Sequence, residues 1–414
     1  MSVNLFGSAD YPAIMVEIGV VSSFSDAALF DAAVFGTGTF GPDVVWTDIS
    51  ADVREVSTNW QRSRELNRQP SATCTVVLSN ADGDYSPSNT GSPFYIAGGT
   101  QLRPRVPLRV TATWAGTEYP VFTGVTTAWR ESFPAMGADA VVTLNASDML
   151  ATLASIDLAT ATSAGAGDTV AQRLTRILNA AAWTGATSFA TGTATMQATT
   201  LGANAATLCQ LTADSDGGLL FADRDGALTY FGRTVSDRTR STTVQATFSA
   251  AGIGFADPEV EFDDDTLINV ARLTRVGGTA QTARDEGSVA LYGEATYERS
   301  DLICTADADA LAIAHLIVTA RSGCEQRVVG LTTYPVRDTS TWPTLLALGI
   351  RDRCSVAVPV PWGTLTRDVF VSGISHSITL GGGWRIRFGF EDATPFIGTG
   401  SFDSSVFDTG TFWL

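Results

Sequence analysis

The fold is decided by residues 46–95, which read WTDISADVREVSTNWQRSRELNRQPSATCTVVLSNADGDYSPSNTGSPFY. Within them, Asp52–Val56 alternates apolar and polar residues, as a strand with one buried face does. Residues 72–78 are rich in β-branched side chains, which favour a pleated, half-buried strand. Asn80–Asp84 supplies a tight turn in which Gly83 is free to take a positive φ. The stretch predicts short strands joined by polar turns, and it contains no nucleophile–base or metal-ligand pattern.

The same strand pattern continues on both sides of this stretch. Many short β-rich runs at even spacing are typical of an antiparallel barrel or sandwich. The Ala115-Gly116 pair between two such runs is a hairpin signal. Before residue 147, strands are predicted at 12–21, 44–46, 52–56, 72–78, 104–114, 117–126 and 139–145.

Residues 147–260 change in character. Val170, Leu174, Ile177 and Leu178 recur at helical spacing and predict a helix with one apolar face. A small α+β region is therefore expected here. Its predicted elements are helices at 148–158, 168–183 and 205–213 and a hairpin at 219–231.

From residue 261 the strand pattern returns. Strands are predicted at 267–275, 288–293, 327–334, 354–360, 367–374 and 384–390, with one helix at 306–321 capped by Thr305. The fold class expected is mainly β, with two antiparallel β-barrel domains separated by a small α+β region. The predicted units are an N-terminal arm (1–43), a first barrel (44–146), an α+β insert (147–260), a second barrel with one helix (261–391) and a C-terminal clasp peptide (392–414).

The two ends of the chain repeat one pattern, F-D-x-x-V-F-x-T-G-T-F, at residues 30–40 and 402–412. Aromatic side chains in Gly/Thr-rich terminal segments stay ordered when they dock on another surface. One interpretation is that both segments are clasps that bind similar grooves on this chain or on neighbouring copies. The other is that each is an edge hairpin that covers the body. The candidate contact residues are Phe30, Phe35, Phe40, Phe402, Phe407 and Phe412.

Composition limits the function. The 414 residues carry a net charge of −17, which argues against binding nucleic acid through its phosphates. Five cysteines are scattered without a C-x-x-C pair, as expected for reduced thiols made in a cytosol. Neither a secretory signal nor an apolar run long enough for a membrane span is recognised. At this length more than one domain is expected.

Candidate catalytic and metal-binding patterns are weak. His315 lies in the predicted 306–321 helix, where a packed histidine is expected, and His376 lies on a strand, where a side chain facing solvent or another subunit is expected. Acidic clusters at 80–84, 214–217 and 223–226 lack the glutamate that ends a calcium-binding loop, so we interpret them as turns. We expect no enzyme activity, no metal and no cofactor.

Arginines concentrate in the first predicted barrel. In an acidic chain they suggest a rim that faces acidic surfaces of neighbouring subunits. The alternative is a set of solvated loop residues. The candidate subunit-contact residues are Arg62, Arg64 and Arg68, and further arginines follow at Arg103, Arg105 and Arg109.

The order of these motifs resembles minor tail proteins of actinobacterial siphophages and, more broadly, the phage tail-tip or baseplate hub family. The resemblance begins with Trp-x-Asp-Ile-x-x-Asp-Val from Trp46, the arginine-rich loop, Thr-Val-Val-Leu-x-Asn-x-Asp-Gly from Thr75 and Ser-Pro-Phe-Tyr from Ser92. It continues with Ser-Asp-x-Leu from Ser147 and Ser-Val-x-Leu-Tyr-Gly from Ser288.

The resemblance implies a structural virion protein at the tail tip, assembled in the host cytoplasm. Three copies would form a ring of six similar modules that mates with a sixfold tail tube and lets DNA pass. The partners implied are a distal tail protein, a tape measure protein and other minor tail proteins, with no specific nucleic-acid binding and no membrane span. From the net charge, we expect acidic residues to line the lumen of such a ring. Because the chain ends soon after the second predicted barrel, no cell-wall-cleaving module is expected.

Two other functions stay open at this point. The first is a distal tail protein that forms a hexameric ring. The second is a carbohydrate-binding or receptor-binding tail-tip protein that uses tryptophans as stacking platforms. The candidate platforms are Trp46, Trp60, Trp114, Trp129, Trp342, Trp362 and Trp384.

Overall fold

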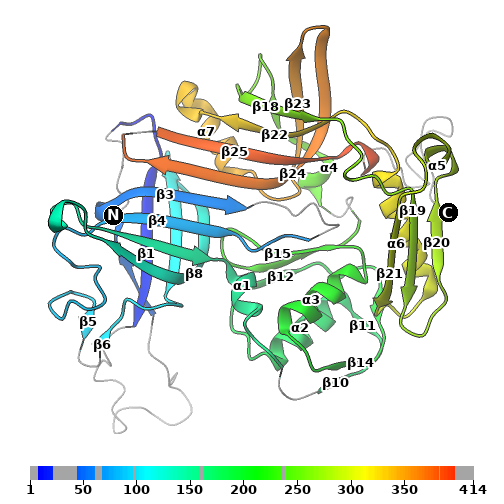
Figure 1. Ribbon diagram of the computed structural model, residues 1–414, viewed down its shortest axis with the longest axis horizontal. Helices are drawn as coiled ribbons and strands as arrows, with labels where there is room; N and C mark the ends of the chain where they lie inside the picture. The colour runs from blue at the N-terminus through cyan, green and yellow to red at the C-terminus, as the bar shows by residue number, and fades with distance from the viewer. Residues whose placement is uncertain are drawn as a thin grey trace.

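The computed structural model describes residues 8–21, 44–60, 68–96, 99–158, 162–234, 238–381 and 383–396. Strands predominate among these residues, and most of them belong to one large, mainly antiparallel sheet (Figure 1). The predicted mainly β class is confirmed. Of the helices described, none is both long and apolar enough to cross a membrane.

Thirteen strands form the large sheet. In the N-terminal half they are β1 (Ala13–Val21), β2 (Val44–Asp48), β3 (Val53–Trp60), β4 (Thr73–Ser79), β7 (Pro107–Trp114), β8 (Thr117–Ser132) and β9 (Val141–Ser147). In the C-terminal half they are β17 (Val244–Phe248), β18 (Ala256–Glu261), β22 (Arg327–Thr333), β23 (Arg353–Val360), β24 (Gly363–Thr379) and β25 (Gly383–Asp392).

Short strands and helices complete the described structure. The strands are β5 (Tyr95–Ile96), β6 (Gly99–Thr100), β10 (Thr162–Ala164), β11 (Asp168–Thr169), β12 (Thr187–Phe189), β13 (Thr195–Met196), β14 (Thr199–Leu201), β15 (Leu219–Ala222), β16 (Leu228–Phe231), β19 (Val270–Arg275), β20 (Gln281–Arg284) and β21 (Thr296–Leu302). The helices are α1 (Met149–Leu153), α2 (Val170–Ala180), α3 (Ala205–Asp214), α4 (Thr239–Thr242), α5 (Glu286–Tyr292), α6 (Asp307–Arg321) and α7 (Trp342–Ala347).

The large sheet runs in the order β18-β22-β25-β24-β3-β4-β9-β8-β7-β1-β2, and β23 and β17 branch from β24. The branch forms because β24 is long enough to pair with two strands along one edge. Its first half pairs with β23, and its second half pairs with β3, from Ile374 opposite Trp60 to Thr379 opposite Glu55. The other edge of β24 pairs with β25.

The prediction of two closed barrels is wrong for the described strands, none of whose sheets closes on itself. The two β halves are also not separated by the insert, because β3 and β24 join them into one sheet. An open sheet edge carries unsatisfied backbone N–H and C=O groups, and each half supplies the partner for the other. Figure 1 shows the strands of both halves side by side in the same layer.

The two halves repeat one topology. In the first half the sheet order is β3-β4-β9-β8-β7-β1, and in the second it is β18-β22-β25-β24-β23-β17. Strands at the same place in the two series also follow one another in the same order along the chain. One difference is that β1 pairs with β7 antiparallel, whereas β17 pairs with β23 parallel. The interpretation of two similar β modules in one chain is therefore supported at the level of strand order.

Local details of the long central strands repeat as well. In β8, pairing with β9 shifts between Thr126 and Ala128, and in β24, pairing with β25 shifts between Val371 and Gly373. The backbone N–H of Arg105 donates to the Thr126 carbonyl, and that of Arg351 donates to the Val371 carbonyl. Both arginines have a positive φ, 70° and 67°. Such a conformation is uncommon outside glycine, so its recurrence marks the same structural device in both modules.

The main apolar core lies on one face of the sheet and includes residues of both halves. Alternation places Cys74, Val76 and Leu78 of β4 in this core, as the sequence predicts. The ring centroids of Trp342 and Trp384 lie 4.8 Å apart, which connects α7 to β25. Fully burying an aromatic side chain of this size stabilises the fold by about 2–3 kcal/mol.

A second core joins the α+β insert to residues 270–318, so it crosses the predicted boundary at residue 260. The helix predicted from residue 168 begins at Val170, because Thr169 caps α2 and forms a capping box with Gln172. Ala306 precedes α6, so the predicted Thr305 cap is wrong. The predicted strand at 288–293 is also wrong, because the Asp285 side chain accepts from the Ser288 N–H and starts helix α5 there.

Candidate interaction surface

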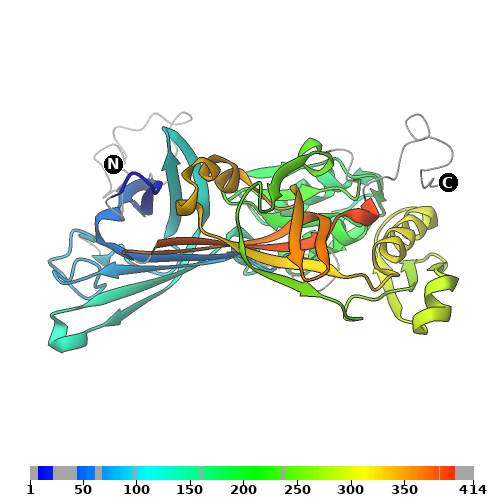
Figure 2. The ribbon, with the colours of Figure 1, turned by 90° about the horizontal axis from the view of Figure 1, so that it is seen from above.

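A central row of eight strands, β18-β22-β25-β24-β3-β4-β9-β8, spans both modules and has a polar side. Figure 2 shows the insert helices and α7 on the other side of this row. Because side chains alternate along a strand, residues that share a register position face the same way. We call the following set the polar face: Glu55, Ser57, Asn59, Thr73, Thr75, Ser79, Thr143, Asn145, Ser147, Glu259, Ser375, Ser377, Thr379, Arg385 and Arg387.

Side chains of the polar face bind one another across strands. The Ser375 hydroxyl donates to Asn59 Oδ1 at 2.9 Å, at the β24–β3 junction. The Thr75 hydroxyl donates to Asn145 Oδ1 at 3.2 Å, between β4 and β9. Cross-strand pairs of this kind each contribute roughly 0.2–1 kcal/mol to sheet stability. The face is therefore an ordered hydroxyl-and-amide surface.

The acidic excess of the chain does not gather on the polar face. Its charged members are the cations Arg385 and Arg387 and the anions Glu55 and Glu259, and Arg130 of β8, which is opposite Thr143, faces the same way. Arg387 Nη2 lies 2.7 Å from both carboxylate oxygens of Glu259. Since both partners are about half exposed, this pair adds little stability, but it neutralises charge locally.

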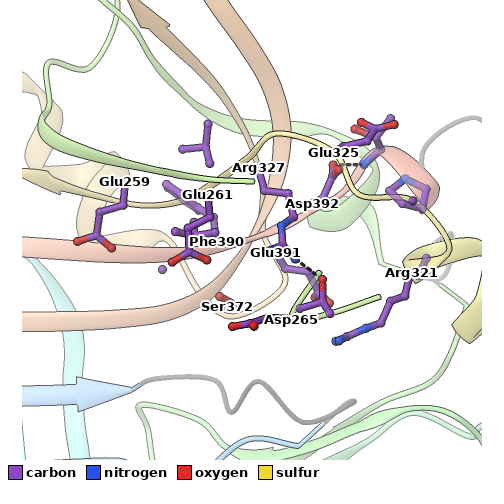
Figure 3. A pocket seen from close by; sticks show the side chains of 18 of the residues that line it. Glu259, Glu261, Asp265, Arg321, Glu325, Arg327, Ser372, Phe390, Glu391 and Asp392 are labelled. Carbon is purple, nitrogen blue, oxygen red and sulfur yellow. Dashed lines mark hydrogen bonds between the residues drawn. The ribbon is translucent and has the colours of Figure 1, made fainter. Parts of the chain in front are cut away.

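A groove of about 550 Å³ lies at the β18 end of the row, against the C-terminal end of α6 (Figure 3). Glu259, Arg387 and Ser375 of the polar face contribute to its wall. Carboxylates outnumber guanidinium groups among its lining residues, which include Glu259, Glu261, Asp265, Glu325, Glu391 and Asp392 together with Arg321, Arg327 and Arg387. Among the described residues that line the groove there is no histidine or cysteine, and therefore no soft metal ligand.

Of the predicted contact residues, Arg68 is described. Its guanidinium lies 3.5 Å from Asp214 Oδ2, and the same carboxylate binds Arg299 at 2.5 Å. Arg68 therefore connects the first module to the insert and to β21, and a contact with a neighbouring subunit stays a prediction. Arg62, Arg64, Phe30, Phe35, Phe40, Phe402, Phe407 and Phe412 lie outside the described residues.

Two other arginines of the first module, Arg109 and Arg105, make contacts within the chain. The Arg109 guanidinium lies 4.4 Å from the Trp46 ring centroid and binds Glu17, which raises the pKa of Arg109. Arg105 donates to the Ser155 hydroxyl at 3.3 Å. These contacts are within one chain, so Arg105 and Arg109 of the predicted positive rim bind residues of their own chain.

Three of the tryptophans considered as saccharide platforms are inside the protein. Trp60, Trp342 and Trp384 are buried, and each packs in the main core. Trp362 is the opposite case, 77% exposed at the turn between β23 and β24. The described tryptophans therefore do not form one stacking surface.

His376 is buried, so the expectation that it faces solvent or a subunit is wrong. It occupies the same side of β24 as Ile374 and Ile378, since alternate residues share a face. Its Nδ1 accepts from Trp384 Nε1 at 3.2 Å. Burial, assisted by the charge of Arg224, lowers the pKa of His376 to about 3, so its imidazole is neutral at physiological pH. His315, expected to be packed, is exposed on α6.

Buried ion pairs hold the modules and the insert in place. Arg173 is fully buried and donates to Asp168, Thr199 and the carbonyls of Gly165 and Gln197 at 2.7–2.9 Å. Helical spacing places position 173 on the apolar face of α2, three residues after Val170, so the signal is available but is not used because the residue is an arginine.

A second ion pair lies at the start of β23. Asp352 is also fully buried, and it binds Arg238 at 3.0 Å and Arg240. Arg238 precedes α4 and Arg240 lies within it. The hydrogen bond to Asp352 raises the pKa of Arg240. These groups are saturated by internal contacts, as structural ion pairs are.

Four of the five described cysteines do not have the character of nucleophiles. Cys74, Cys209, Cys304 and Cys354 are buried free thiols, and burial raises the pKa of each of them. A thiol with a raised pKa is a poor nucleophile at neutral pH.

Comparison with solved structures identifies this architecture. The 43 kDa tail protein of prophage MuSo2 from Shewanella oneidensis superposes with a TM-score of 0.55 at 12% identity, over 93% of this chain and 98% of that one. The chain has a phage tail-protein fold. A tail protein from Neisseria meningitidis has a TM-score of 0.57 at 11% identity, over 92% of this chain and 96% of that one.

Other comparisons add two facts. No protein-family model and no curated protein sequence matches the chain. A weaker likeness, with a TM-score of 0.48, is to the Escherichia coli c3393 protein, a component of the type VI secretion system. At these identities the likeness concerns the fold of the tail proteins, which the order of sequence motifs also indicates.

Proposed function

We propose that this protein is a structural hub at the tip of a phage tail, where three copies form a ring that adapts a sixfold tail tube to the tail tip. The observation that carries the proposal is the repeated topology of the two modules within one sheet. Three chains with two modules each place six similar surfaces around an axis. A closed ring of identical subunits satisfies all of its interfaces, as soluble assemblies generally do.

The polar face is the surface we assign to the lumen of this ring. Its serine, threonine and asparagine side chains bind each other, and Arg387 is paired with Glu259. DNA phosphates bind most strongly to clusters of unpaired cations. A wall of hydroxyl and amide groups with paired charges would let DNA pass without strong attachment. The acidic lumen expected from the net charge is replaced by this weakly charged lining.

The alternatives are less well supported by the described residues. A hexameric distal tail protein needs one module per chain for sixfold symmetry, and this chain has two. A saccharide-binding surface built on the seven tryptophans loses Trp60, Trp342 and Trp384 to the core. The neighbouring proteins in tail assembly, a distal tail protein and a tape measure protein, are proposed as partners on the resemblance of the sequence motifs.

The experiment that tests the proposal is a mass measurement of the purified chain combined with electron microscopy of tail particles. Three copies in a ring at the tail tip is the expected result. Six copies per ring would favour the distal tail protein instead. A position along the tube or on a side fibre would contradict a hub.

A further inference from the structure

The repeated topology also predicts how one copy would bind the next. Within the chain, the second half of β24 pairs with β3 and so joins the modules. By position in the two series, β8 corresponds to β24 and β18 corresponds to β3. We infer that β8 of one copy pairs antiparallel with β18 of a neighbouring copy, repeating the β24–β3 junction between chains. This inference rests on the proposed ring and specifies its interface.

Both strand edges needed for this pairing are open in the described sheet. β8 pairs with β7 up to Val125, and beyond Thr126 that edge has no strand partner among the described residues. The corresponding edge of β24 is the one occupied by β3. β18 pairs with β22 on one side, and no described strand lies on the other. β8 and β18 stand at opposite ends of the central row, so the contact is head-to-tail and can close a ring.

The register follows from the structural correspondence. Val125 pairs with the first residue of β7, and Phe370 pairs with the first residue of β23. Counting from this anchor gives three corresponding pairs. Trp129 corresponds to Ile374 of β24, Arg130 to Ser375 and Ser132 to Ser377.

The other strand is anchored through its neighbours. Ser57 is opposite Thr75, which is opposite Asn145, and Asn145 is opposite Ala128 of β8. Glu259 is opposite Gly330, which is opposite Gly389, and Gly389 is opposite Gly373 of β24. By the same count Ala128 corresponds to Gly373, so Ser57 corresponds to Glu259.

The predicted partners across the junction are chemically compatible. Ile374 pairs with Trp60, Ser375 with Asn59 and Ser377 with Ser57 inside the chain. The equivalent pairs between copies are Trp129 with Phe262, Arg130 with Glu261 and Ser132 with Glu259. Opposite charges and paired aromatic rings directly across an antiparallel ladder are both favourable.

Phe262 provides independent support. Its side chain is 71% exposed, directly after β18, whereas Trp60 at the corresponding place is buried and lies opposite Ile374 of β24. A neighbouring β8 would cover Phe262 in the same way. The ladder is short because Pro258 immediately precedes Glu259 in β18 and Pro134 follows the end of β8, and proline has no N–H to donate. An edge limited in this way avoids extended, non-specific pairing.

The test uses cysteine pairs in the full-length chain with Cys324→Ser, since Cys324 is the described cysteine that is not buried. Ser132→Cys with Glu259→Cys is expected to form a disulfide between chains on mild oxidation. Ser57→Cys with Ser377→Cys is the matched control, because this equivalent pair closes within one chain. Glu131→Cys with Glu259→Cys places one thiol on the opposite face of the strand and is expected to cross-link poorly.

A second variant tests the aromatic contact. Phe262→Ser is expected to weaken association about ten- to a hundredfold, the loss that corresponds to one buried phenylalanine. Leu291→Ser on α5 removes an equally exposed side chain, 72% exposed, outside the junction and is expected to leave association unchanged.

Electrophoresis without reductant and mass measurement in solution give separate answers. A cross-linked ladder that stops at three chains supports both the junction and the trimeric hub. A trimer without the Ser132–Glu259 cross-link overturns the junction and leaves the proposed function standing. Cross-linked rings of six chains support the junction and overturn the trimer. A chain that stays monomeric at its highest soluble concentration and forms no cross-link overturns both.

Discussion

Acid is expected to weaken the junction between the two modules through His376. This histidine lies on β24 opposite Thr58 of β3 and is 2% exposed. Its Nε2 has no hydrogen-bond partner among the described residues, and its Nδ1 accepts from Trp384. An imidazolium in this place would have to give up the Trp384 bond and carry a buried charge. The folded state therefore resists protonation.

The size of the effect follows from the difference in pKa between the two states. The pKa of His376 is about 3 in the folded protein, against about 6.5 for a histidine in an unfolded chain. The unfolded state binds the extra proton between these values, so the free energy of unfolding is fully retained above pH 6.5 and falls as the pH drops. From pH 7 to pH 5 the loss is about 2 kcal/mol, and by pH 3 it reaches about 4 kcal/mol.

The assay is urea unfolding, followed by tryptophan fluorescence, of the wild type and His376→Gln at pH 7 and pH 5. Glutamine keeps an acceptor for Trp384 but does not titrate. The wild type and the variant are compared because protonation of Asp148 changes the free energy of unfolding in the opposite direction. Burial raises the pKa of Asp148 to about 6, so its protonation stabilises the fold as the pH falls from 6 towards 4. That contribution is common to both proteins and cancels.

The expected result is that the wild type loses about 2 kcal/mol more than His376→Gln over this range. His315→Gln, which removes the exposed histidine of α6, is the control for loss of a histidine elsewhere. If the stability difference between wild type and His376→Gln is the same at pH 7 and pH 5, the reasoning fails. His376 would then titrate as it does in the unfolded chain, and the junction would not be dry.

Three further predictions concern the packing of single residues. Arg173→Met should lower the free energy of unfolding of the insert by about 3–5 kcal/mol in a denaturation experiment, because buried carbonyls and Asp168 lose their donor. Arg176→Met, at a half-exposed site, should lower it by under about 1 kcal/mol in the same experiment. Gly124→Ala should cost about 1–3 kcal/mol by thermal unfolding, since its Cβ would lie 2.2 Å from the Ser147 carbonyl oxygen, whereas Gly254→Ala meets no atom within 4 Å. Trp362→Ser, at an exposed turn, should change stability by less than about 0.5 kcal/mol, and a larger loss of stability would show that the ring packs on its own chain.

Sequence patterns were sufficient where the cause of structure is local. β4 lies within one residue of its predicted bounds, and α2 lies within three residues of its predicted bounds. Gly83 takes the positive φ of 75° that its turn requires. In each case the signal is contained in neighbouring residues, because side-chain periodicity and turn geometry act over a few positions.

Patterns failed where a cap or a tertiary contact decides. The 288–293 segment has strand-like residues, yet a cap from Asp285 makes it a helix. His376 alternates with serines, so period-two reasoning places it with Ile374 and Ile378, but whether that face is the buried one depends on what covers β24. Arg173 donates to the carbonyls of Gly165 and Gln197, which lie 8 and 24 positions away and meet it only when the insert folds.

The sequence by itself determined a β-rich chain with an α+β insert, the order of its motifs and the resemblance to tail proteins. The tertiary structure decided that the two β parts are one sheet, that they share a strand order, and that a nearly neutral polar face runs across both. The physical reason is the range of the interactions. Periodicity and capping are encoded by neighbours, whereas the β24–β3 ladder brings together residues more than 300 positions apart, whose pairing is fixed only when both edges and both cores are in place.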